Sequence, residues 1–129
     1  MRPLTTFALA GALVLGLATP AAASGAAADH GVDIRGVATC DHDTREWVIT
    51  WTVRNLSEVA GTIGNVRVAP PGRPLVALPQ RVDAGATVTG TQRLLATEFT
   101  ARVQLDVNWD DGPVTFDHHW PVYIRAFCG

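Results

Sequence analysis

Two segments of the chain alternate apolar and polar residues, and this alternation limits the fold more than any other feature. The segments are residues 47–54 and 101–109. A period of two with β-branched and aromatic residues is typical of a strand that buries one face against a core. We therefore expect each apolar set to point inward between two sheets. The sets are Trp47, Ile49, Trp51 and Val53 in the first segment, and Val103, Leu105, Val107 and Trp109 in the second.

Turn residues and a returning strand follow the second segment. Asp110–Pro113 has the composition of a hairpin turn, and the alternation resumes through Val114, Phe116, His118 and Trp120. No segment has a helical period over more than two turns, so we expect an all-β domain of about seven strands in two packed sheets. The weaker strands are predicted at Val32–Thr39, Thr62–Val68, Leu75–Leu78 and Thr87–Leu95.

The start of the chain has the pattern of a secretory signal peptide. Arg2 is followed by an apolar run over residues 7–18 and by small residues up to Ala23. This order is typical of an export signal, and the run is shorter than the roughly 20 residues that a membrane-spanning helix needs. We predict cleavage after Ala23, with Ala28 as the alternative. The expected divisions are a signal peptide at 1–23, a flexible lead-in at 24–31 and a sandwich domain at 32–129, with no membrane insertion after cleavage.

The chain contains two cysteines, Cys40 and Cys128. In an exported domain of this size they are expected to pair in one disulfide. Two free buried thiols or an intermolecular bridge are the alternatives. Two cysteines without a nearby Cys-x-x-Cys or histidine spacing fall short of a tetrahedral metal site.

The charge of the chain argues against nucleic acid as a partner. Loss of Arg2 with the signal leaves 9 basic and 12 acidic residues, a net charge of −3. Nucleic-acid-binding domains carry a basic stripe or patch instead. All 10 basic residues are arginine, which indicates the genome of a high-GC bacterium.

A resemblance adds to this interpretation. Cys40, a short acidic stretch and the Trp-x-x-x-Trp strand within Glu46–Asn55 resemble a segment of small secreted and sortase-anchored surface proteins of Streptomyces and related actinobacteria. The similarity spans roughly residues 34–128. It implies an immunoglobulin-like sandwich with a terminal cysteine, located in the cell envelope. The chain has no Leu-Pro-x-Thr-Gly-type signal, stalk or C-terminal helix, so we expect no covalent attachment to the wall.

Three groups of residues are candidates for metal chemistry, and each has an ordinary explanation. His118 and His119 are adjacent, so on a strand their side chains face opposite sides. His30 would suit Cu(II) or Ni(II) only if cleavage occurred after Ala27. The acidic segment Asp41–Glu46 lacks the glycine and length of a calcium loop, and Asp110–Asp111 is expected at the opposite end of the sandwich. We therefore predict no metal or other cofactor.

Catalytic motifs are also missing from the sequence. The chain has no Gly-x-Ser-x-Gly motif, and Ser24 and Ser57 are its two serines. A small sandwich with short loops has little room for a cleft. We therefore expect a non-enzymatic protein.

The predicted function is binding or structure, outside the cell or at its wall. Loops Leu56–Gly61, Pro70–Pro74 and Asp110–Pro113 are candidate contact surfaces, because loops on a rigid scaffold carry most recognition. An unknown protein or a cell-wall glycan is the expected partner. An inhibitor of an extracellular hydrolase, acting through the Pro-rich loop Ala69–Pro74, is the alternative. Candidate contact residues are Trp120, Tyr123 and Arg73, with Pro121 expected to expose Trp120 or Tyr123 near a sheet edge.

Overall fold

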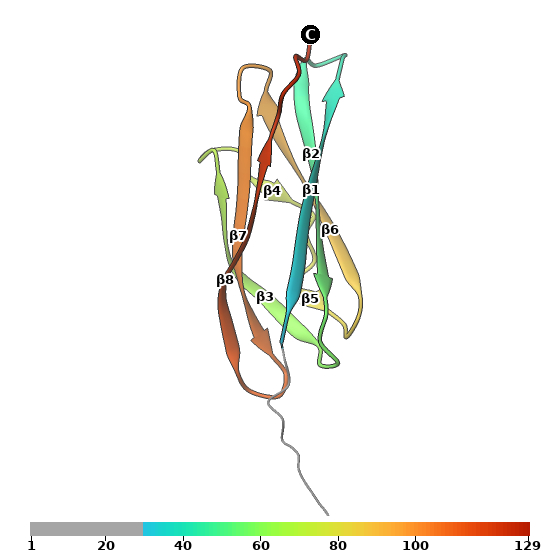
Figure 1. Cartoon of the computed structure of the whole chain (residues 1–129), viewed down its shortest axis with the longest axis vertical. Helices are drawn as coiled ribbons and strands as arrows, with labels where there is room; N and C mark the ends of the chain where they lie inside the picture. Colours follow the sequence, from blue (N-terminus) through green and yellow to red (C-terminus); the bar gives the residue numbers. More distant parts are fainter. Residues whose placement is uncertain (1–29) are drawn as a thin grey trace, which may run out of the picture.

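Two four-stranded antiparallel sheets pack face to face in the computed structural model, which describes residues 30–129 (Figure 1). The signal peptide and most of the lead-in predicted from the sequence lie outside the described residues. Within them there is no helix, so the prediction of an all-β domain with two packed sheets is confirmed. The strands are β1 (Val32–Asp41), β2 (Glu46–Asn55), β3 (Gly61–Ala69), β4 (Leu75–Val76), β5 (Arg81–Val82), β6 (Thr87–Leu95), β7 (Thr100–Trp109) and β8 (Val114–Tyr123).

The strand order is β1-β2-β6-β4 in one sheet and β5-β3-β7-β8 in the other. About seven strands were expected, and the additional one is the two-residue β5, which is too short to leave a pattern. β4 ends at Val76, two residues earlier than predicted. Ala77 adopts a φ of 66°, which ends the extended conformation there.

The core forms where the two alternating segments face each other. Trp51, on β2, and Leu105, on β7, are both 0% exposed. All eight inward-facing residues predicted from the alternation are buried, which confirms the assignment of three tryptophans to the core. Further core residues come from the ends of β1, β3, β5, β6 and β8: Ile34, Ile63, Val82, Leu94 and Val122.

The predicted disulfide is present. Cys40, near the end of β1, joins Cys128 across a Cα–Cα distance of 5.4 Å and a sequence separation of 88 residues. The bond fastens the tail after β8 to the β1–β2 hairpin. In the chain-entropy model, closing a loop of this length stabilises the fold by roughly 4–5 kcal/mol.

A bulge interrupts the alternation of β8, which corrects the pattern expected for that strand. Val107 pairs with Thr115 and Leu105 pairs with His118, so Phe116 and Asp117 together oppose one residue of β7. Phe116 therefore turns out to solvent and is 67% exposed, instead of sharing the inner face with His118. An extra residue of this kind reverses the facing of every position on one side of it.

β3 carries a second bulge at the same level of the sheet. Its register shifts between Gly64 and Arg67, and Asn65 adopts a φ of 50°. Asp106, on the central strand β7, contacts both bulges. Its carboxylate accepts hydrogen bonds from Asn65 Nδ2 at 2.9 Å and from the backbone N–H of Asp117 at 2.9 Å. The two irregularities are therefore fixed by one side chain.

β1 and β8 lie side by side as the edge strands of their two sheets (Figure 1). Gly36 allows this approach. A Cβ at that position would lie 2.6 Å from Cγ2 of Val122 and 2.7 Å from the ring of Trp51. The edge strands thus close tightly at Gly36 and Val122, and a space remains between their earlier residues.

Candidate functional site

The Pro-rich loop between β3 and β4 is held from the core by Gln92. This side chain, on β6, is 1% exposed. Its Nε2 donates to the carbonyls of Ala69 and Arg73, at 3.2 and 2.9 Å, and its Oε1 accepts from Trp51 Nε1 at 2.9 Å. The loop closes on itself through Arg73 N–H and the Pro70 carbonyl, at 3.2 Å. The backbone at both ends of the loop is therefore fixed to the core.

The tip of this loop faces solvent. Pro71, Gly72 and Pro74 are exposed, and Gly72 has a φ of 89°, a conformation that favours glycine. The combination of a fixed backbone and an exposed tip is what a preformed recognition loop requires.

Arg73, a predicted contact residue, is half-buried and ties this loop to the β6–β7 turn. Its Nε and Nη2 donate to the two carboxylate oxygens of Glu98, at 2.8 and 3.3 Å. Glu98 also accepts from the backbone N–H of Leu95 at 2.7 Å. The hydrogen bond from Arg73 holds the pKa of Glu98 below its usual value. Bidentate pairs of this kind fix geometry as well as charge.

Trp120 and Tyr123, the other predicted contact residues, lie on the edge strand β8. Trp120 is 37% exposed and Tyr123 is 66% exposed. The guanidinium of Arg35, on β1, lies 4.4 Å from the centroid of the Trp120 ring. Arg35 Nε also pairs with Asp33 Oδ1 at 3.2 Å. The structure thus joins Trp120 to β1 and does not bring it together with Arg73.

A cavity of about 310 Å³ opens between β1 and β8, next to the residues that precede Gly36 and Val122 in these two strands. We call it the seam cavity. It is lined by Val32, Asp33, Ile34, Asp117, His118, His119 and Trp120.

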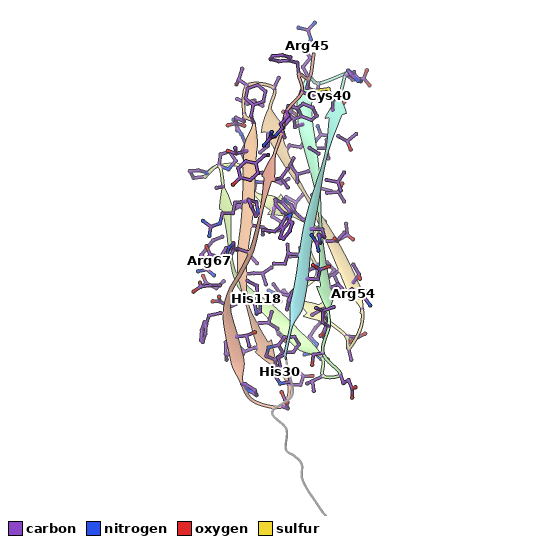
Figure 2. The ribbon with its side chains drawn as sticks, viewed as in Figure 1. His30, Cys40, Arg45, Arg54, Arg67 and His118 are labelled. Carbon is purple, nitrogen blue, oxygen red and sulfur yellow. A yellow bond between two sulfur atoms is a disulfide. The ribbon has the colours of Figure 1, made fainter. Side chains whose placement is uncertain are left out.

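His118, which lies between β8 and β1 in Figure 2, belongs to a short hydrogen-bond chain. Trp109 Nε1 can only donate, and it donates to Thr115 Oγ1 at 2.9 Å. The same Thr115 hydroxyl forms a hydrogen bond of 2.6 Å with Nε2 of His118. No hydrogen bond within residues 30–129 uses Nδ1 of His118. Burial lowers the pKa of His118, which keeps the ring neutral at physiological pH.

A polar cluster at the end of the sandwich that carries the β7–β8 turn was not predicted from the sequence. His30 Nδ1 lies 3.1 Å from Ser57 Oγ, and Nε2 lies 2.9 Å from Asp111 Oδ2. The ring stacks on Trp109 with centroids 4.8 Å apart. His30 and its neighbour Gly31, whose carbonyl accepts from Leu56 N–H at 2.9 Å, thus contact the sandwich from within the predicted lead-in of residues 24–31.

This Ser–His–Asp arrangement is closed to substrate. Ser57 is 5% exposed, and its Oγ already accepts the backbone N–H of Val59 at 2.9 Å. The His30 side chain is also 5% exposed. A nucleophile must reach a reacting atom, so the cluster serves to join the β2–β3 and β7–β8 loops. Residues 30 and 111 are 81 positions apart, and no local pattern in the sequence connects them.

The two acidic loops lie at opposite ends of the molecule, as expected (Figure 1). Each is engaged by an arginine. Asp41 Oδ2 and Glu46 Oε1 accept from Arg93 at 3.2 and 2.8 Å, and Asp110 pairs with Arg81 at 2.7 Å. Within residues 30–129, no group of three or more His, Cys, Asp or Glu side chains is placed to hold a metal ion. The described part of the chain also contains no helix long and apolar enough to cross a bilayer.

The fold and these sites define a disulfide-closed β-sandwich with a fixed Pro-rich loop and a polar cavity between two sheet edges. No protein-family model matches the chain, and no curated protein matches it.

Proposed function

We propose that the chain is an exported, non-enzymatic binding domain of a high-GC bacterium, which presents the loop Ala69–Pro74 to a protein partner at or outside the cell envelope. The anchoring of that loop by Gln92 is the observation that carries the proposal. A loop already fixed in one conformation loses little conformational entropy on binding, so more of its contact energy appears as affinity.

The strand order supports an immunoglobulin-like scaffold for this domain. In such a sandwich the sheets have the orders A-B-E-D and C-F-G. Here β1, β2, β6 and β4 take the first order, and β3, β7 and β8 take the second, with β5 added beside β3. The disulfide differs from that of antibody domains, because it joins the end of β1 to the tail instead of crossing between the B and F strands.

The chemistry available at the surface supports a binding role. Cys40 and Cys128 are bonded to each other, Ser57 is buried, and the carboxylates of Asp41, Glu46 and Asp110 are paired with arginines. None of these groups is free to act as a nucleophile or a general base. Binding, by contrast, requires only the exposed tip of a rigid loop.

The test is partner capture by the mature, oxidised protein, Ser24–Gly129, from purified cell wall and culture supernatant of a high-GC Gram-positive bacterium. The variant Pro71→Glu changes the exposed tip, and Glu58→Arg changes the exposed loop at the other end of the domain. We expect Pro71→Glu to abolish capture of a saturable protein partner and Glu58→Arg to retain it. Capture that is equal for both variants, or absent for the wild type, would overturn the proposal.

An inhibitor of an extracellular hydrolase is the second candidate. The exposed Pro71-Gly72 tip between two fixed carbonyls favours it, because a loop held at both ends resists the distortion that cleavage requires. A panel of extracellular proteases and glycoside hydrolases at micromolar protein tests this candidate. Inhibition lost in Pro71→Glu supports it, and no inhibition of any member rejects it.

A further inference from the structure

We propose that the seam cavity between β1 and β8 binds a neutral saccharide unit. This proposal uses a different surface from the loop Ala69–Pro74 and does not depend on it. The volume of the seam cavity, about 310 Å³, lies at the lower end of the range for ligand pockets, roughly 300–1,000 Å³. The cavity therefore suits one sugar ring of a longer chain better than a large cofactor.

Three kinds of group in the cavity match the chemistry of a sugar. Trp120 supplies an aromatic ring for the apolar face of the sugar, since an indole offers a large apolar surface with a polar edge. Asp33 and Asp117 supply carboxylates, which accept hydrogen bonds from hydroxyls. His118 supplies Nδ1, which no hydrogen bond within residues 30–129 uses and which can donate to or accept from a sugar hydroxyl according to its tautomer.

Trp120, Asp33 and Asp117 each have an arginine neighbour that orients the side chain. Arg35 lies on one face of the Trp120 ring and pairs with Asp33, so both side chains are oriented by the same guanidinium. Asp117 pairs with Arg67 at 3.2 Å and accepts from Gln104 Nε2 at 3.0 Å. A preorganised polar site loses less freedom on binding than a mobile one.

The same groups argue against other ligand classes. Each carboxylate in the lining is already paired with an arginine, Asp33 with Arg35 and Asp117 with Arg67, so the cavity offers no unpaired positive charge to an anion such as a phosphate or an acidic sugar. A purely apolar ligand would remove water from Asp33, Asp117 and His118 without replacing their hydrogen bonds. A divalent cation is not favoured, because no group of three ligand side chains within residues 30–129 is placed to hold one.

The experiment is a titration of the mature, oxidised protein with chitotriose, cellotriose and maltotriose, followed by the NMR signals of the Trp indoles and of His118. Trigalacturonate is the acidic control. We expect at least one neutral trisaccharide to shift the Trp120 indole and His118 signals saturably, while the signals of the buried Trp51 stay unchanged. We expect trigalacturonate to shift neither.

Matched variants locate the binding. Trp120→Ala is expected to weaken binding of the active trisaccharide at least tenfold. Tyr123→Ala, on the same strand and outside the cavity lining, is expected to change it less than twofold. Three results overturn the proposal: no shift of Trp120 by any neutral trisaccharide at millimolar concentration, equal binding of the acidic one, or equal loss in both variants. The titration of the wild-type protein can reject the proposal by itself, so the test does not depend on whether a variant folds.

Discussion

Trp51 Nε1 donates a hydrogen bond of 2.9 Å to Oε1 of Gln92, and both side chains are at most 1% exposed. This contact links the centre of the core to the surface loop Ala69–Pro74, because the other end of the Gln92 amide holds the loop carbonyls. A buried side-chain amide whose donor and acceptor atoms are all hydrogen-bonded stabilises the fold. Removal of the amide leaves each of its former partners unpaired.

Gln92→Leu is therefore expected to destabilise the domain by about 2–4 kcal/mol, since the Trp51 N–H and two carbonyls lose their partner. It should also release the loop, so that limited proteolysis cuts within residues 69–74. Urea unfolding and proteolysis measure the two effects. Thr89→Ser, on the exposed side of the same strand, should change stability by less than about 0.5 kcal/mol. A Gln92→Leu protein with an intact loop and wild-type stability would contradict this account.

Asp106 predicts a loss of stability in acid. Its pKa is lowered, first by the backbone N–H of Asp117 and then by Asn65 and Arg67. The unfolded chain therefore takes up a proton at a higher pH than the folded one. The stabilisation is fully present above the ordinary carboxyl pKa of about 3.9, and it is lost as pH falls through the lower, folded value.

We expect Asp106→Asn to be less stable than the wild type at pH 7 and to lose less stability between pH 4 and pH 2.5. Urea unfolding at several pH values measures how the free energy of unfolding changes with pH in the variant and in the wild type. Asp83→Asn, at an exposed turn, is the control and should follow the wild-type curve. Parallel curves for Asp106→Asn and the wild type would show that the two bulges do not depend on this charge.

Gly36 predicts a steric effect at the contact of the two sheet edges. A Cβ there would lie 2.6 Å from Val122 and 2.7 Å from Trp51, so Gly36→Ala is expected to cost about 1–3 kcal/mol. Val122→Ala in the same chain should recover part of this loss, because it removes the nearest atom. Gly64→Ala has nothing within 4 Å of the new Cβ and should be nearly neutral. Thermal unfolding compares the wild type, these three variants and Val122→Ala alone, and losses in the double variant equal to the sum of the two single losses would reject the clash.

His118 predicts a second dependence on pH, in a higher range. Burial lowers its pKa in the folded state, so the unfolded chain binds a proton first, near the ordinary value of about 6.5. Stability is then complete above that value and decreases as pH falls from about 7.5 toward 5. In His118→Asn this decrease should disappear, whereas His119→Asn should keep it. A slope unchanged by His118→Asn would assign the effect to another group.

The strands with a buried and an exposed face were predictable from the sequence. Trp51 and Val103 lie on the inner face because period-two alternation reports directly which side of a strand is buried. The disulfide followed from the count of two cysteines in a chain predicted to be exported. β5 was missed because two residues carry no period.

The bulge in β8 and the candidate sites could not be predicted in this way. The alternation over residues 114–120 continues through the bulge, and only the pairing with β7 shows that Phe116 turns outward. Gln92 is a polar residue in a strand. The shorter of its two hydrogen bonds to the loop joins it to the carbonyl of Arg73, 19 residues away in the sequence. The seam cavity forms between β1 and β8, which are far apart in the chain. Tertiary contacts of this kind leave no local signal.

The disulfide between Cys40 and Cys128 gives the last prediction. It closes a loop of 88 residues and fastens the tail, whose Ile124 N–H donates to the Phe99 carbonyl at 2.7 Å. The double variant Cys40→Ser/Cys128→Ser is expected to lose about 2–5 kcal/mol. Hydrogen exchange should increase first at Ile124, because the tail then keeps only this backbone hydrogen bond and the packing of Ile124 and Phe127, among the contacts that the described residues show. Urea unfolding with and without reductant supplies the control: reduction should lower the stability of the wild type to that of the double variant and leave the double variant unchanged. A loss below about 1 kcal/mol would mean that the sandwich is held by its core alone.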